Sequence, residues 1–192
     1  NSLHTPLFHS RVIDLHAVHG NKALVLQEQQ SFVHDYGVSS EYWPTTSVEQ
    51  RHWLLEPLGR YMLALAGFYE AKAEASNDPG YYNKAATQYS DFLASLPDHE
   101  KRFEIQLLWA RALAKGGDIP LAISTLESIA YGEEATEVSA DAGYEALLAY
   151  PVLIASFAGN DKKQHHWQSK MAHSQLWFIR HFPLDSRIKR LQ

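Results

Sequence analysis

The sequence predicts an all-α protein made of stacked antiparallel helical hairpins, with about eight helices. Apolar residues recur at helical spacing in successive stretches, and short turns rich in Gly, Asn, Asp and Pro separate these stretches. No window alternates apolar and polar residues with the β-branched enrichment of a strand. A turn-plus-helix pattern around Ala85 also returns around Ala122, which is typical of repeat proteins.

The N-terminal part predicts one hairpin over residues 1–37. Apolar residues follow a helical period over residues 6–19, Gly20-Asn21 interrupts it, and a second helical pattern covers residues 22–36. Gly37 stands where a left-handed C-terminal cap is expected, because glycine adopts that conformation without steric cost.

A polar connection over residues 38–47 follows this hairpin and contains Tyr42-Trp43-Pro44. Pro44 pushes the preceding residue out of helical geometry. Tyr42 and Trp43 can serve as a contact point for a partner. Alternatively, they can pack on the helices and hold the connection against them, which we call the plug interpretation. The plug is the favoured interpretation, since large aromatic side chains gain free energy from burial.

The next stretch predicts a hairpin with a long first helix. Ser47 and Gln50 have the spacing of a capping box, so a helix is expected over residues 48–75. A turn at Asn77-Asp78-Pro79-Gly80 precedes a helix over residues 82–96, which ends before Pro97.

The remaining helices are expected over residues 99–115, 119–131, 138–157 and 162–181. They complete one continuous domain. Its predicted segments are a hairpin at 1–37, a connection at 38–47, repeats at 48–97 and 98–135, a hairpin at 136–183, and the start of a further helix at 184–192.

The repeated pattern identifies a family resemblance. After a turn glycine come an apolar residue, a fixed alanine, and apolar residues four and seven positions beyond that alanine. This pattern resembles the tetratricopeptide repeat, a helix–turn–helix of roughly 34 residues. The matching residues are Tyr82, Ala85, Tyr89, Phe92 and Pro97 in one unit, and Ala110, Gly117, Ile119, Ala122, Leu126 and Ile129 in the next. The long helix over residues 48–75 departs from the usual repeat length.

The resemblance implies a solenoid of tetratricopeptide type, in which the first helix of each hairpin lines a concave groove for a protein or peptide partner. The family's groove positions correspond here to Glu70, Glu74, Glu104, Leu107, Arg111, Lys115 and Tyr144. Leu107 can instead pack between hairpins. Glu104, Arg111 and Lys115 are the stronger candidates, because charged side chains are seldom fully buried.

Two further stretches, residues 32–43 and 140–150, look like an internal part of large bacterial exported proteins built from such repeats. This similarity implies a periplasmic or otherwise extracytoplasmic fragment of a longer chain, and a cytoplasmic location is the alternative. The absence of cysteine is compatible with export but excludes disulfides and cysteine-based zinc sites.

Composition and motifs argue against several functions. A formal net charge of -5 without a long basic run disfavours nucleic-acid binding. No apolar run approaches the roughly 20 residues of a membrane span. His16 and His19, with His9 further back, have usable metal-ligand spacing, but a site would need a third ligand such as Asp14 or one from elsewhere, so surface histidines are the preferred interpretation. No nucleophile or phosphate-loop motif is present, and neither catalysis nor a cofactor is expected.

The leading hypothesis is therefore a scaffold that binds a protein or peptide along its groove. One alternative is a structural spacer or self-association module, which would form homo-oligomers through apolar end faces. The other is a helical auxiliary domain of a larger enzyme. The sequence leaves these alternatives open.

Overall fold

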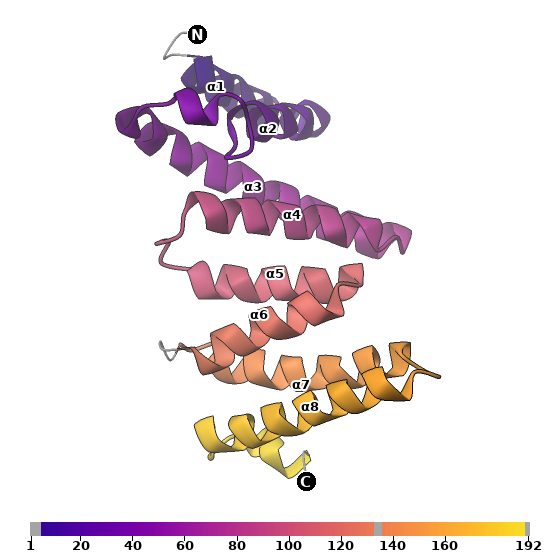
Figure 1. The fold of residues 1–192 in the computed structure, drawn as a ribbon. Coiled ribbons are helices and arrows are strands. Elements are labelled where there is room, and N and C mark those ends of the chain that lie inside the picture. The colour runs from indigo at the N-terminus through magenta and orange to yellow at the C-terminus, as the bar shows by residue number, and fades with distance from the viewer. Residues whose placement is uncertain (1–4, 133–135, 191–192) are drawn as a thin grey trace. The chain divides into compact units, whose positions relative to one another are not determined.

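The computed structural model describes residues 5–132 and 136–190, and the regular elements in these residues are all helical (Figure 1). This confirms the predicted all-α fold with eight α-helices. The chain divides into two compact units, Asn1–Arg102 and Phe103–Gln192. We call them the first unit and the second unit and describe each by itself.

The first unit consists of two hairpins. Its elements are α1 (Thr5–Val18), α2 (Lys22–Tyr36), the 3₁₀ helix η1 (Trp43–Thr45), α3 (Val48–Ser76) and α4 (Gly80–Ser95). α1 packs on α2, α2 packs on α3, and α3 packs on α4 along much of its length. The capping box predicted at the start of α3 is present, with the backbone N–H of Gln50 donating to the Ser47 hydroxyl at 3.2 Å.

The predicted left-handed cap at Gly37 is wrong. Gly37 has φ −68° and ψ 169°, so the chain leaves α2 in an extended conformation, while the Gly37 N–H still donates to the Val33 carbonyl at 2.9 Å. Glycine is required here for a different reason, since a Cβ at this position would clash with the same Val33 carbonyl oxygen. The extended exit directs the polypeptide into the connection that leads to α3.

Small residues let α3 and α4 approach each other closely. Ala66 and Ala73 of α3 and Ala85 of α4 are buried. Gly59 also faces α4, where an added Cβ would lie 2.7 Å from Leu96 Cδ1 and 3.0 Å from Phe92 Cε2. The burial of Ala85 is what the repeat pattern predicts, because a larger side chain would separate the two helices.

Replacing Ala85 by leucine is expected to lower the free energy of unfolding by about 1–3 kcal/mol, because the added atoms overpack a filled interface. Ala94 lies on the same helix and is exposed, so Ala94→Leu should leave stability within about 0.5 kcal/mol. Chemical denaturation followed by circular dichroism measures both values. Equal effects from the two variants would contradict the packing assigned to Ala85.

The second unit contains the remaining helices. They are α5 (Arg102–Gly116), α6 (Ile119–Tyr131), α7 (Ser139–Ser156), α8 (Asp161–His181) and the 3₁₀ helix η2 (Ser186–Arg190). α5 begins three residues later than expected, since the Arg102 N–H closes a turn by donating to the His99 carbonyl at 2.9 Å. The further helix predicted from residue 184 is a 3₁₀ helix, and residues 191–192 lie outside the described part.

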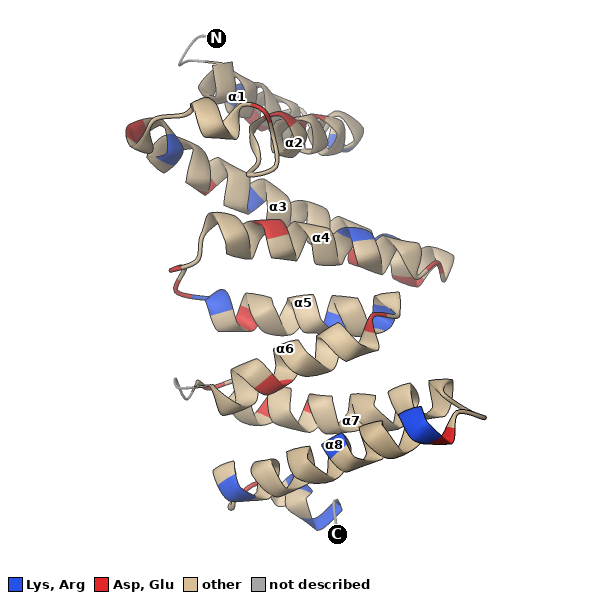
Figure 2. Ribbon diagram, viewed as in Figure 1, with Lys and Arg blue, Asp and Glu red and all other residues tan. Residues whose placement is uncertain are grey.

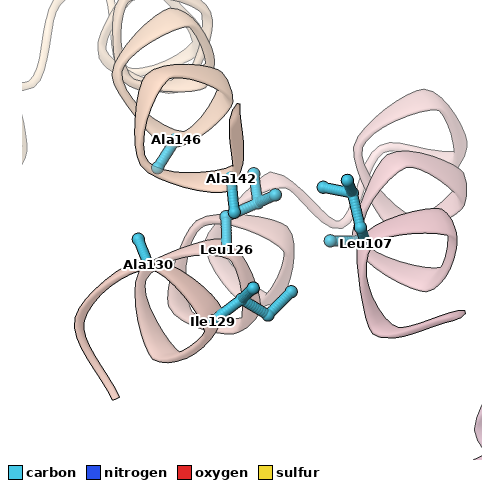
Figure 3. Packing of buried hydrophobic residues seen from close by; sticks show 7 residues of the cluster. Leu107, Leu126, Ile129, Ala130, Ala142 and Ala146 are labelled. Atoms are coloured by element: carbon cyan, nitrogen blue, oxygen red, sulfur yellow. The ribbon is translucent and has the colours of Figure 1, made fainter. Parts of the chain in front are cut away.

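A cluster of apolar side chains joins α5, α6 and α7 (Figure 3). Leu107 extends from α5 toward α6, where Leu126 and Ile129 lie, and α7 contributes Ala142 and Ala146. Ala122 is also fully buried, in agreement with the repeat pattern. Gly143 lets α8 approach α7, because a Cβ there would lie 2.9 Å from Phe178 Cδ2.

Candidate functional site

An open groove of ≈ 970 Å³ lies in the first unit, lined by the start of α1, by α2, by the connection after it, and by α3 and α4. Its lining combines carboxylates with tyrosines. The carboxylates are Asp35, Glu41 and Asp91, and the tyrosines are Tyr36, Tyr42 and Tyr69. Pockets of this volume accommodate small molecules or several side chains of a peptide.

The end of α2 and the connection form one side of the groove. Tyr36 is buried at the last turn of α2, and its ring meets the ring of Tyr42 edge to face at 5.2 Å. Trp43 is held next to it, with the guanidinium of Arg51 5.3 Å from the centre of the indole. Both aromatic side chains therefore pack onto the helices, as the plug interpretation predicts, and Tyr42 lines the groove as well.

α3 and α4 supply the other lining residues. Leu65 of α3 is buried, and the Tyr69 hydroxyl accepts a hydrogen bond from Gln30 Nε2 of α2 at 2.9 Å. Gln88 and Asp91 follow each other by about one turn on α4, so they share a face of that helix. Gln88 Oε1 is shielded from solvent and accepts no hydrogen bond within the described residues.

The groove carries negative charge that no lysine or arginine of its lining offsets. His34 is the lining residue that can become positive. Within residues 5–132 and 136–190, no side-chain hydrogen bond or ion pair engages Asp35, Glu41 or Asp91. Figure 2 shows acidic and no basic colour on the loop that joins α2 to α3.

Burial changes the acidity of two lining groups. It raises the pKa of the Asp91 carboxyl, because desolvation disfavours the ionised form. Burial is also the main cause that raises the pKa of Tyr36, and the negative charge of Asp35 adds to it. Above the raised pKa, ionised Asp91 opposes folding, and a cation bound beside it would offset that cost.

A smaller hollow of ≈ 390 Å³ lies on α1, α2, the connection and α3. Its lining is mainly apolar and includes Leu7, Phe32 and the exposed Trp53. Tyr42 lines both hollows, so its side chain lies between the acidic groove and the apolar pocket.

Two of the groove residues predicted from the repeat, Glu70 and Glu74, lie in the first unit on α3, and neither lines the acidic groove. Glu70 hydrogen-bonds with the Tyr89 hydroxyl of α4, and burial together with this carboxylate raises the pKa of Tyr89. Glu70 therefore contributes to the packing of α3 on α4. Glu74 is exposed one turn further along.

The other predicted residues lie in the second unit. Glu104 and Lys115 are exposed on α5, at opposite ends of that helix. Arg111 forms an ion pair with Glu145 of α7, with Nε 2.9 Å from Oε2. Charge pairing of this kind links α5 to α7 and occupies the guanidinium.

Leu107 and Tyr144 also have structural roles. Leu107 is 5% exposed within the apolar cluster, so it packs in the core of the second unit. Tyr144 is half-buried, and the guanidinium of Arg187 lies 4.8 Å from the centre of its ring. Arg187 also donates to Asp141 at 2.7 Å, which holds η2 against α7.

Two of the histidines that suggested a metal site have other partners within the described residues. His9 Nε2 lies 2.9 Å from Glu28 Oε2, and the His9 ring packs 5.3 Å from that of Phe32. His19 Nδ1 lies 2.7 Å from the Leu15 carbonyl of the preceding turn. In the part of the chain that the structure describes, no group of three or more histidines and carboxylates is placed to hold a metal ion.

Tyr42 is predicted from the sequence as a possible contact point for a partner, but the other residues that line the groove were not predicted as site residues. Asp35-Tyr36 and Glu41-Tyr42 repeat an acidic–aromatic pair on the two sides of Gly37, and this pattern could have drawn attention to the connection. No comparable signal marks Gln88 and Asp91, since only the packing of α4 on α3 brings them to the same groove.

The described helices include none that combines the length and apolarity needed to cross a bilayer. The chain was also compared with known proteins. No model of a known protein family matches the sequence, and a search of curated proteins returns no similar sequence.

Proposed function

We propose that this chain is a protein-interaction module of tetratricopeptide type, and that a segment of its partner binds in the groove of the first unit. The observation that supports this role is the ≈ 970 Å³ groove with carboxylates that have no partner within the described residues. The burial of Ala85 and Ala122 is in keeping with the repeat resemblance.

The lining suits a peptide better than a small apolar molecule. Carboxylates accept hydrogen bonds from backbone N–H groups and from basic side chains, and tyrosines combine apolar area with a polar end. An extended segment can therefore gain hydrogen bonds without displacing existing ones.

Selection of a random peptide library on the intact chain tests this function. We expect enriched peptides to shift the backbone amide resonances of residues 34–42, Tyr69, Gln88 and Asp91 in ¹⁵N-labelled protein. Ser39→Trp places an indole at the groove and should weaken binding by obstruction. Ser76→Trp, at an exposed position outside the groove in the same unit, is the matched control and should bind as the original chain does.

Enriched peptides that shift only resonances elsewhere, or that bind the two variants equally, would contradict the groove as the site. Failure to enrich any peptide, combined with concentration-dependent association in sedimentation experiments, would instead favour the self-association alternative. Exposed Val12, Leu15 and Val18 of α1 would provide an apolar surface for that role.

A further inference from the structure

We infer that the outer face of α8, the side of this helix turned away from α7, binds the surface of an anionic membrane. We call it the basic face, and its side chains are Lys162, Lys163, Lys170, Leu176, Trp177 and Arg180. The contact is peripheral and needs no membrane-spanning helix. Because the basic face belongs to the second unit, it is independent of the groove in the first unit.

The charge of the chain is distributed unevenly along its length. Residues 161–192 contain seven lysines and arginines against two acidic residues, a formal net charge of +5, whereas residues 1–160 contain ten against twenty, a net charge of −10. Figure 2 shows basic colour at both ends of α8 and on the segment that follows it. A mildly acidic chain that confines its positive charge in this way attracts an anionic partner to that region.

The basic residues of α8 share its exposed side. Lys162 and Arg180 are 18 positions apart, about five helical turns, so they lie on one line that extends over about 27 Å. Lys163 and Lys170 lie on the flank of this line, and all four residues are exposed. Phe178 lies almost opposite, where it packs on Gly143 of α7. Charges spread over such a length fit an extended anionic surface better than a single small anion.

These cations are not neutralised within the second unit. Among the residues that the structure describes, no carboxylate forms an ion pair with Lys162, Lys170 or Arg180, whereas Arg187 of η2 is paired with Asp141 and Asp185. Lys170 Nζ lies 4.6 Å from the centre of the Trp167 ring, a contact that leaves its charge uncompensated. An anionic surface can therefore approach α8 without breaking existing ion pairs.

Exposed apolar side chains favour a membrane over a nucleic acid. Leu176 and Trp177 are exposed among the cations of α8, and Leu184, shortly after the helix, is 98% exposed. Leucine gains nothing from nucleic-acid phosphates, whereas leucine and tryptophan both partition into the headgroup region of a bilayer. Lysine and arginine can reach lipid phosphates at the same time, because their charged ends extend beyond their apolar stems.

Flotation of the intact chain with lipid vesicles tests the inference. One set of vesicles contains equal parts of phosphatidylglycerol and phosphatidylcholine, and the other contains phosphatidylcholine alone. At low salt we expect binding to the anionic vesicles to be at least about tenfold tighter, and we expect added salt to weaken it by screening. Failure to bind the anionic vesicles, or equal binding to both sets, would overturn the inference.

Charge-removing variants test whether the basic face is the contact. Lys162→Gln combined with Arg180→Gln should weaken binding at least about tenfold, since each basic residue near an anionic bilayer contributes about fivefold. Lys22→Gln combined with Lys101→Gln is the matched control, because both lysines are exposed in the first unit and the net charge is the same. The control should bind as the original chain does. Equal loss of binding in the two double variants would contradict the assignment to α8.

A leucine variant separates a membrane surface from a nucleic-acid surface. Leu176→Gln should weaken vesicle binding about fivefold by removing apolar area, while Leu15→Gln, at a similarly exposed position on α1, should not change it. A DNA duplex titrated at the same salt should bind more weakly than the anionic vesicles. Tighter binding to the duplex, or vesicle binding that is unaffected by Leu176→Gln, would show that the membrane is the wrong partner.

Discussion

Replacing Phe32 by alanine is expected to lower the free energy of unfolding of the first unit by about 3–5 kcal/mol, the range for removing a buried aromatic side chain. Phe32 of α2 is 0% exposed. Its ring centre lies 4.8 Å from that of Tyr36, 5.0 Å from that of Tyr61 and 5.3 Å from that of His9. Removal leaves a cavity among three rings, which rigid helices close only in part.

The same substitution should also alter the groove, because the Phe32 ring packs against the ring of Tyr36 and Tyr36 lines the groove. The expected readouts are a lower denaturation midpoint by circular dichroism and faster amide hydrogen exchange in α2 and α3. Phe8→Ala is the matched control, since Phe8 is 61% exposed on α1 and should cost less than about 1 kcal/mol. A loss below about 1 kcal/mol for Phe32→Ala would show that this aromatic cluster is not the core of the unit.

The helices were predictable because their signals are local. Periodic apolar residues, a capping box at Ser47 and turn residues at Gly20 and Gly80 each act within a few positions of the chain. The buried alanines were predictable for a related reason, because close helix crossing restricts side-chain volume wherever a hairpin forms. Ala85 and Ala122 are both 0% exposed.

Predictions that depended on the direction of the chain or on partners across helices were less accurate. A left-handed cap is expected at Gly37 because glycine usually has that role at the end of a helix. Glycine is instead needed here because a Cβ would clash with the Val33 carbonyl oxygen, and only the three-dimensional structure shows this contact. Similarly, nothing in the sequence indicates that Arg111 pairs with Glu145, which lies 34 positions away.

The acidic groove could not be inferred for the same reason. Asp35 and Glu41 are near each other in sequence, but Asp91 reaches the groove only through the packing of α3 and α4 on α2. A carboxylate on an amphipathic helix is ordinarily a solvated surface residue. What distinguishes Asp91 is partial burial, and that property belongs to the tertiary structure.

The core of the second unit can be tested independently through Phe178. This residue of α8 is 0% exposed, and it packs against the backbone of α7 at Gly143, where a Cβ would lie 2.9 Å from the ring. The ring of Phe182 lies 5.2 Å away and the guanidinium of Arg187 5.9 Å away. We expect Phe178→Ala to lower the free energy of unfolding of this unit by about 3–5 kcal/mol.

The effect should extend to the C-terminal segment, because Phe178 supports both Phe182 and Arg187. Faster hydrogen exchange in residues 182–190 is therefore expected together with a lower denaturation midpoint. Leu176→Ala serves as the control on the same helix, since Leu176 is 54% exposed and its truncation should cost less than about 1 kcal/mol. If both variants were equally stable, α8 would not be held on α7 by Phe178.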